Sequence, residues 1–344
     1  MKVIMLLPEF EEGGVERHVL WLTACLEKQG HQVLLATAGG KLESSLPPGV
    51  RVLRLPVQRK NPLAAFYSAV RLAAFARVEN ADLFHAHSRV PAWIAWWAAA
   101  LSRRPWVVTA HDRYRKNAAI APFRRAAGAI CVSEAVRAHL QGFLPERAVV
   151  VRNGIPDPSA RWRPREDKAP YRFLFVGRLT KRKGLHVALS ALAELGGHAW
   201  SLDVVGDGPQ KGELESRVLA MGIAERVRFH GFRDDVADWM AGADCLLFPS
   251  FDEGMPLTLM QAVRVGLPVL ASKIDPVAEL VEDESRLLLP GDASAWKEAL
   301  LDVMEGRKAP PVYDPGLVPS DAQMSREVLG FYGETLFHGK GGRP

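Results

Sequence analysis

Two cationic residues in the second half of the chain are placed to bind phosphate. They lie in the segment 175–184, FVGRLTKRKG, where an apolar run is followed by a loop with four cations. Arginine offers phosphate oxygens a planar fork, and lysine offers a point charge. Arg178 directly follows the apolar run and Lys183 precedes a glycine, so we expect these two to hold a diphosphate. Solvated surface charge is the alternative, and we expect it for Lys181 and Arg182.

A second segment, 253–257 (EGMPL), combines a carboxylate with a glycine and a proline ahead of a helical pattern. Gly254 lets main-chain N–H groups approach a ligand closely, and Pro256 suits a first helical turn, where its missing N–H is not needed. Donors at a helix N-terminus favour a sugar or phosphate oxygen. Glu253 can accept hydrogen bonds from sugar hydroxyls. It also suits the helix dipole as a plain N-terminal carboxylate, and the two roles are compatible.

The first half of the chain adds a glycine pair and three histidines. Gly13 and Gly14 stand between the first apolar run and the first helical pattern, where free N–H groups favour phosphate. A plain strand-to-helix turn is the alternative. His85 and His87 lie in DLFHAHS and His111 lies in VVTAHDR, two segments that end predicted strands. We expect His85 in the core and no metal, because no carboxylate or cysteine completes a ligand set.

Short apolar runs alternate with helical patterns along the chain, which predicts parallel sheets with helices on both faces. The expected strands are 3–7, 31–36, 50–55, 82–86, 107–110, 129–132 and 148–151, followed by 173–176, 201–205, 227–230, 245–248, 269–271 and 285–289. Helices are expected over 14–28, 62–79, 184–195, 210–221, 235–241, 257–265 and 321–336, with further helices between the first strands.

Residues 156–170 interrupt this alternation with four prolines and no periodicity, which predicts a linker. We expect one Rossmann-like domain over 1–157, a linker over 158–170 and a second Rossmann-like domain over 171–320. The helix over 321–337 is expected to pack back on the first domain. The predicted fold is therefore α/β, with two doubly wound domains facing each other across a cleft lined by strand ends.

Composition excludes several classes of protein. With 48% hydrophobic and 24% charged residues, the chain is neither disordered nor a coiled coil. Its longest apolar run, 90–101, is about half the ~20 residues of a membrane-spanning helix, and no signal peptide pattern is present, so we expect a cytoplasmic protein. The three cysteines lie far apart in apolar contexts and are expected in the core.

Charge is uneven along the chain. Residues 1–165 hold 24 Lys and Arg against 12 Asp and Glu, whereas the remainder holds 20 against 27. A basic half indicates an anionic partner such as a membrane surface, with incidental surface charge as the alternative. The basic segment 113–125 is the expected membrane or acceptor surface, and three tryptophans upstream of it, at positions 93, 96 and 97, are expected mostly in the core.

Six motifs, in this order and spacing, resemble the retaining glycosyltransferases of family 4, which have the GT-B fold. They are GGVER at 13–17, RNGI at 152–155, VGRLTKRKG at 176–184, VGDGP at 205–209, VRFHGF at 227–232 and EGMPLTLMQ at 253–261. The resemblance covers most of the chain, and the combination is far more specific than any single motif.

The resemblance implies that the second domain holds a nucleotide sugar and the first holds the acceptor. It implies catalytic roles for His111, Arg178, Lys183 and Glu253, with His111 and Glu253 on the donor sugar. The implied donor-binding residues are Gly14, Gly177, Arg178, Lys183, Gly206, Phe232, Glu253, Gly254, Met255, Pro256, Leu257 and Gln261. On the acceptor side, we expect His87, Ser88 and Arg113.

Gln261 departs from the family pattern, which usually has a second glutamate at this position to bind the ribose hydroxyls. An amide still hydrogen-bonds a diol but lacks the charge, so we expect donor binding to be weaker by about 1 kcal/mol.

The expected function is transfer of a hexose-type sugar from a UDP- or GDP-sugar to a glycan or lipid-linked acceptor, without a cofactor or nucleic acid. The segment HSRVPAW at 87–93 is similar to lipopolysaccharide-core transferases, which favours lipopolysaccharide or cell-envelope polysaccharide synthesis at the inner membrane face. Two alternatives stay open. One is a GT-B sugar-nucleotide epimerase, which needs no acceptor. The other is a non-catalytic member that binds a glycan or lipid, an option that Gln261 keeps open.

Overall fold

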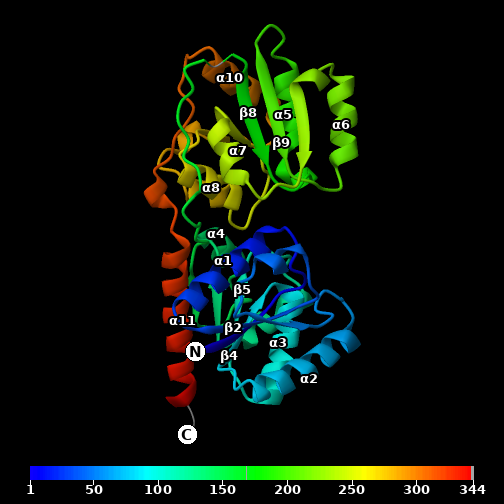
Figure 1. Cartoon of the computed structure of the whole chain (residues 1–344), viewed down its shortest axis with the longest axis vertical. Helices are drawn as coiled ribbons and strands as arrows, with labels where there is room; N and C mark the ends of the chain where they lie inside the picture. Colours follow the sequence, from blue (N-terminus) through cyan, green and yellow to red (C-terminus); the bar gives the residue numbers. More distant parts are fainter. Residues whose placement is uncertain (168, 342–344) are drawn as a thin grey trace. The chain divides into compact units, whose positions relative to one another are not determined.

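The computed structural model describes residues 1–167 and 169–341, without the side chains of the last four (Figure 1). The described chain divides into two compact units. The first unit is Met1–Pro156 together with the segment that begins at Pro319, and the second is Asp157–Val318. In the described part of the chain, no helix has the length and apolar character needed to cross a membrane.

The first unit contains a sheet of seven parallel strands in the order β3-β2-β1-β4-β5-β6-β7. Its strands are β1 Lys2–Leu6, β2 Gln32–Thr37, β3 Arg51–Arg54, β4 Leu83–His87, β5 Trp106–Ala110, β6 Gly128–Cys131 and β7 Ala148–Val150. In register, Val3 lies opposite both Val33 and Leu83. β1, β4, β5 and β6 are almost entirely buried, as expected for central strands covered on both faces.

Helices cover this sheet: α1 Gly14–Lys28, α2 Pro62–Val78, α3 Arg89–Ser102, α4 Glu134–His139 and α11 Asp321–Gly341, with the 3₁₀ segment η2 Ala118–Arg125. Helix α11, red in Figure 1, packs beside α1 although the whole second unit separates the two in sequence. A Cβ atom at Gly128 would lie 2.5 Å from the Phe331 ring, so this glycine lets α11 approach β6 closely. Phe331 and Tyr332 thereby complete the core around Leu22 and Leu83.

The second unit contains five parallel strands in the order β10-β9-β8-β11-β12. These are β8 Tyr171–Val176, β9 Trp200–Val205, β10 Val227–Gly231, β11 Cys245–Phe248 and β12 Val269–Ala271. Its helices are α5 Leu185–Ala193, α6 Lys211–Ala220, α7 Val236–Gly242, α8 Leu257–Val265, α9 Asp275–Ala278 and α10 Ala293–Met304. Phe173, Leu189, Leu202 and Trp296 belong to one apolar core in this unit.

The proline-rich segment expected as a linker belongs to the second unit. The Trp162 main-chain N–H donates to the Val265 carbonyl at 2.9 Å, and its indole donates to the Ala243 carbonyl at 2.8 Å. Arg165 forms an ion pair at 2.6 Å with Asp244, whose side chain is 2% exposed. These contacts hold an irregular segment on the unit, although its prolines and its lack of periodicity predicted a free linker.

Two further expectations differ from the structure. The strand predicted over 285–289 is wrong: a 3₁₀ turn, Glu284–Arg286, occupies its start because the Asp283 carboxylate accepts a hydrogen bond from the Ser285 N–H. Leu288 alone forms a bridge, to Ser272. The three tryptophans of α3, expected mostly in the core, are half-buried, and the Trp93 ring makes a tilted contact with Trp96 and an edge-to-face contact with Trp97.

Candidate functional site

An ion pair in the second unit joins the loops that follow β8 and β11. The Lys183 ammonium donates to Glu253 Oε1 at 2.6 Å and lies 5.9 Å from the centroid of the Phe248 ring. The Glu253 side chain is only 7% exposed, whereas that of Lys183 is 24% exposed. A nearly buried carboxylate needs such a partner, because an unpaired buried charge is costly. The two residues expected to work together are therefore in direct contact.

Gly184 makes this contact possible. Its φ of +69° lies in the left-handed region, and a Cβ there would come within 1.9 Å of the Pro249 carbonyl oxygen. Arg182 fastens the two loops from the other side: its carbonyl accepts from Phe251 N at 2.8 Å and its Nε donates to the Asp252 carbonyl at 2.7 Å. The side chain of Arg182, which we expected to face solvent, is 39% exposed and also contacts the Glu253 loop.

The glycines after β8 and β9 bring two more loops together. The N–H of Gly206 donates to the Gly231 carbonyl at 2.7 Å, and a Cβ on Gly206 would lie 2.0 Å from the Gly177 carbonyl oxygen. Phe232, directly after Gly231, is half-buried. Gly208, which we had not singled out, is equally constrained, since its Cβ would meet the Leu179 backbone at 2.5 Å. The motif glycines thus allow close backbone packing at one end of this sheet.

Helix α8 begins immediately after the Glu253 loop. Gly254, Met255 and Pro256 are buried, whereas Leu257 and Gln261 are half-buried on the first turns. Pro256 occupies the N-cap position instead of the first helical turn that we expected, and it still leaves no unused N–H there. Arg178 is exposed, and no described residue forms an ion pair with it. A free guanidinium beside the end of β8 remains available to an anionic ligand.

The expected residues of the first unit lie at the carboxyl ends of β4 and β5. His87 ends β4, His111 follows β5, and His87 Nδ1 lies 2.9 Å from His111 Nε2. His87 is fully buried, and its ring stacks on that of His111. His85 lies in the core as predicted, between the Tyr332 hydroxyl at 2.5 Å and the Thr109 hydroxyl at 2.6 Å.

The remaining expected residues of this unit surround the same strand ends. Ser88 has a φ of +87° and precedes α3, a strained conformation for a residue with a side chain. Arg113 is half-buried, and its N–H donates to the Asp112 carboxylate at 2.8 Å. Burial raises the pKa of the neighbouring Tyr114 to about 12. Gly14 is the exposed first residue of α1.

Sequence reasoning missed a fourth histidine of this cluster. His18 of α1 is 2% exposed, and its ring centroid lies 4.8 Å from that of His111. Its position three residues after Val15 and four before Leu22 placed it on the buried face of the helix, which was the available clue. His18, His87 and His111 can each offer a ring nitrogen within 4.8 Å of the others, so the expectation that no ligand set exists here is not met.

Burial keeps these imidazoles neutral. It lowers the pKa of His18 to about 4 and that of His85 to about 3. Burial and the neighbouring imidazoles hold the pKa values of His87 and His111 well below the usual 6.5. At neutral pH the cluster therefore offers ring nitrogens with lone pairs and N–H donors without carrying charge.

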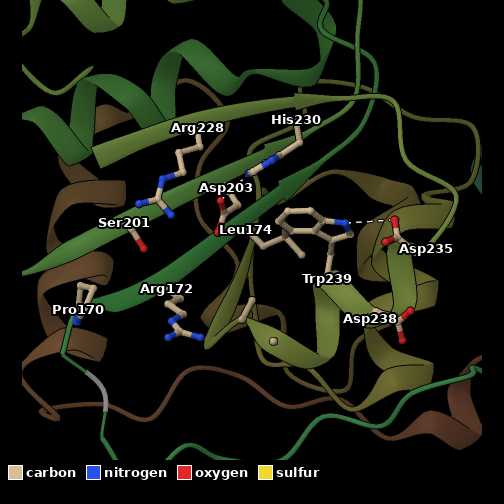
Figure 2. Close-up of a pocket in the computed structure, with 12 residues that line it drawn as sticks. Pro170, Arg172, Leu174, Ser201, Asp203, Arg228, His230, Asp235, Asp238 and Trp239 are labelled. Atoms are coloured by element: carbon tan, nitrogen blue, oxygen red, sulfur yellow. Dashed lines mark hydrogen bonds and ion pairs between the residues drawn. The ribbon is translucent and has the colours of Figure 1, made fainter. Parts of the chain in front are cut away.

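A polar hollow of about 680 Å³ lies on one face of the second sheet (Figure 2). Alternate residues of β8, β9 and β10 line it, among them Arg172, Asp203 and His230, with Trp239 of α7 beside them. His230 and Asp203 pair at 2.6 Å. The expectation that helices bury both faces of this sheet is therefore wrong at β9 and β10. None of the expected donor-binding residues lines this hollow.

Known proteins match both units of the chain. Residues 12–157 match the family model for Glycosyltransferase Family 4, and residues 170–306 match the one for Glycosyl transferases group 1. The phosphatidyl-myo-inositol mannosyltransferase of Mycobacterium leprae is 30% identical over 338 residues, covering 88% of this chain and 87% of that protein. The lipopolysaccharide glucosyltransferase WaaG of Escherichia coli is 26% identical over 310 residues, covering 80% of each.

A solved structure shows the same fold. Anabaena HepE in complex with UDP-glucose has a TM-score of 0.76 and 21% identity, covering 99% of this chain and 98% of that one. The two Rossmann-like units are accordingly those of the GT-B fold. The chain is a glycosyltransferase and belongs to family 4 of these enzymes.

Proposed function

We propose that this enzyme transfers a hexose-type sugar, with retention of configuration, from a UDP- or GDP-sugar to a glycan or lipid-linked acceptor. The proposed setting is lipopolysaccharide or cell-envelope polysaccharide synthesis. The observation that carries the proposal is the contact between Lys183 and Glu253, with the unpaired Arg178 in the same group of loops. The relatives named as a phosphatidyl-myo-inositol mannosyltransferase and a lipopolysaccharide glucosyltransferase support a lipid-linked acceptor and this setting.

The proposed donor site has one part for each portion of a nucleotide sugar. Arg178 and Lys183 bind the diphosphate, the N-terminus of α8 and Glu253 bind the sugar hydroxyls, and Gln261 binds the ribose. Main-chain donors at a helix start need no reorganisation during the reaction, so they stabilise charge efficiently as it develops. HepE, whose structure contains UDP-glucose, supports a nucleotide-sugar donor.

The proposed reaction is a displacement on one face of the sugar. The acceptor oxygen forms a bond to the anomeric carbon while the bond from that carbon to the diphosphate oxygen breaks. The acceptor hydroxyl proton passes to an oxygen of the leaving diphosphate. Arg178 and Lys183 stabilise the negative charge that collects on this leaving group. For the first unit, we propose that His111 binds a sugar hydroxyl and that the N-terminus of α1, at Gly14, binds a phosphate oxygen.

A matched pair of lysine variants tests the donor site. Lys183→Ala should lower kcat/KM by about 10²–10³-fold, because it removes one fixed donor to the developing charge. Lys181→Ala removes an exposed cation two residues away and should change kcat/KM less than about twofold. Glu253→Ala should abolish transfer while the far-UV circular dichroism spectrum stays unchanged. Wild-type activity in Lys183→Ala or Glu253→Ala would exclude this site.

The donor and the stereochemistry need separate measurements. A thermal-shift screen against UDP-, GDP- and ADP-sugars identifies the donor, since a ligand that binds only the folded state raises the melting temperature. The anomeric configuration of the product, read by NMR, tests retention. Conversion of the donor sugar without any acceptor would indicate an epimerase, and donor binding without turnover would indicate a non-catalytic binding protein.

We propose further that the enzyme works in the cytoplasm at an anionic membrane surface. Four apolar side chains share one face of α2 and are between 43% and 79% exposed: Leu63, Phe66, Tyr67 and Val70. The exposed Arg59, Lys60 and Arg71 flank them. An apolar helical face with basic neighbours suits the headgroup region of an anionic bilayer.

Sedimentation with lipid vesicles tests the membrane proposal. Wild-type protein should sediment with anionic vesicles and much less with zwitterionic ones. The double variant Leu63→Ser, Phe66→Ser should bind at least about 10-fold more weakly, because two exposed apolar groups no longer enter the lipid. Leu219→Ser, at a position 69% exposed in the second unit, serves as the control. Equal binding by wild type and double variant would contradict this surface.

A further inference from the structure

Three imidazole rings from three separate elements meet inside the first unit. His18 comes from α1, His87 ends β4, and His111 follows β5. The ring centroids of His18 and His87 lie 5.6 Å apart, and those of His87 and His111 lie 5.2 Å apart. Two of the rings are buried, with exposed fractions of 2% for His18 and 0% for His87. Because the elements are distant in sequence, only the folded unit brings these rings together.

The buried rings have hydrogen-bonding capacity that the protein does not use. Among the described residues, neither ring nitrogen of His18 has a partner with hydrogen-bond geometry, and neither does Nε2 of His87. A buried polar atom without a partner typically costs about 1–3 kcal/mol. This unused capacity indicates a ligand that binds at least one ring nitrogen of His18.

We propose that His18, His87 and His111 form a binding site for one divalent transition-metal ion of the Zn²⁺ class. Each residue can offer one ring nitrogen, and these atoms lie within 4.8 Å of one another. Neutral imidazole suits Zn²⁺, Ni²⁺ and Cu²⁺, whereas Mg²⁺ and Ca²⁺ prefer oxygen ligands, which this set lacks. Three protein ligands leave a fourth position for water or another small ligand.

The geometry needs only small side-chain movements to close around an ion. At Zn–N distances of about 2.0–2.1 Å, tetrahedral ligand nitrogens lie roughly 3.4 Å apart. The three ring nitrogens lie within 4.8 Å of one another, so side-chain shifts of about an ångström bring them to that spacing. Nδ1 of His87 and Nε2 of His111, at 2.9 Å, are already close enough to share an ion in place of the hydrogen bond between them.

The surroundings also suit metal ligands. Metal binding requires unprotonated imidazole, which is the ordinary state of histidine at pH 7 because its usual pKa is about 6.5. A histidine ligand usually donates its other N–H to a nearby oxygen, which fixes the ring orientation. Asn153, 4% exposed, interacts with His18, and its side-chain oxygen is itself without a partner in hydrogen-bond geometry. This amide is placed to orient His18 once the opposite ring nitrogen binds the ion.

Metal binding at this site can be measured without donor or acceptor. His111 is also the proposed sugar contact, so the ion and the donor compete for one of its ring nitrogens. The proposed transfer uses cations and main-chain donors of the second unit and needs no metal. The ion is therefore expected to hold the three elements together, and the site can be tested without any sugar.

Titration of the full chain with Co²⁺ and Zn²⁺ tests the proposal. After chelator treatment and buffer exchange, one equivalent of Co²⁺ should give visible absorption bands typical of a four-coordinate ion, and Zn²⁺ should displace it. His18→Ala and His111→Gln should each weaken binding by more than about 100-fold, since each removes a ligand. His198→Ala, in the second unit, should bind like the wild type.

The variants make the result decisive. Far-UV circular dichroism identifies variants that fold, and His111→Gln, at a half-buried position, decides the matter if His18→Ala does not fold. The site is supported if the wild type binds one equivalent of Co²⁺ and the folded ligand variants lose this binding. The proposal is overturned if the folded wild type does not bind Co²⁺ at about 0.1 mM. It is also overturned if the wild type and the folded ligand variants bind Co²⁺ with equal affinity. Because no sugar is present, neither outcome bears on the glycosyl transfer.

Discussion

Mild acid should destabilise the first unit through its buried histidines. In the unfolded chain a histidine has a pKa near 6.5, whereas burial lowers the pKa to about 4 for His18 and about 3 for His85. The folded state therefore binds fewer protons than the unfolded state below pH 6.5. The stability is fully present above that pH and is lost as the pH falls toward the folded-state pKa values.

The size of this loss of stability follows from the pKa values of His18 and His85. Between pH 7 and pH 5, each of the two histidines should remove roughly 2 kcal/mol from the free energy of unfolding, or about 4 kcal/mol together. His87 and His111, with pKa values lowered in the same direction, should add to the loss. Domains of this size are stable by only about 5–15 kcal/mol, so the effect should be large.

Urea denaturation at pH 7, 6 and 5, followed by far-UV circular dichroism in the presence of chelator, measures this loss. His18→Gln keeps a polar side chain but no longer titrates, so its loss between pH 7 and pH 5 should be roughly 2 kcal/mol smaller than that of the wild type. If both proteins lose the same free energy over this range, the buried neutral state of His18 is refuted.

Four further outcomes can be checked. Gly184→Ala should cost about 2–4 kcal/mol in urea denaturation, because it combines a left-handed conformation with a Cβ 1.9 Å from the Pro249 carbonyl oxygen. Tyr332→Phe leaves His85 Nδ1 unpaired and should cost about 1–3 kcal/mol in the same assay. Gln261→Glu restores a carboxylate for the ribose and should lower the Kd for the nucleotide by about fivefold in calorimetry. Transfer activity should persist in chelator, and its complete loss there would overturn the proposed metal-free chemistry.

The strand and helix pattern was predictable because the central strands are continuous apolar runs. The bounds of α1 and α8 agree with the prediction, since glycines and prolines mark their ends clearly. The alternating polar residues of β9 and β10 were also visible in the sequence. They were overlooked because strand-helix alternation predicts covered faces, whereas Arg228 and its neighbours face a hollow.

The predicted site depended on motifs whose residues are close in sequence. Lys183 and Glu253 could be paired because each lies in a motif that follows a predicted strand. The contact of Arg182 with the Glu253 loop was missed because its Nε donates to a main-chain carbonyl, that of Asp252, which no sequence motif reveals. His18 was missed because its proximity to His87 and His111 arises from packing between a helix and two distant strands. The donor-site roles themselves stay predictions.

The return of α11 to the first unit has a consequence for protein synthesis. Met324, Val328, Phe331 and Tyr332 belong to the core of the unit that is translated first, yet they follow the second unit in the chain. The ribosome must therefore release all of Asp157–Val318 before that core can close. Until then, the nascent first unit exposes apolar surface beside β6 and α1, where it is open to chaperones and to aggregation. The second unit, whose residues are contiguous, can complete its own fold earlier.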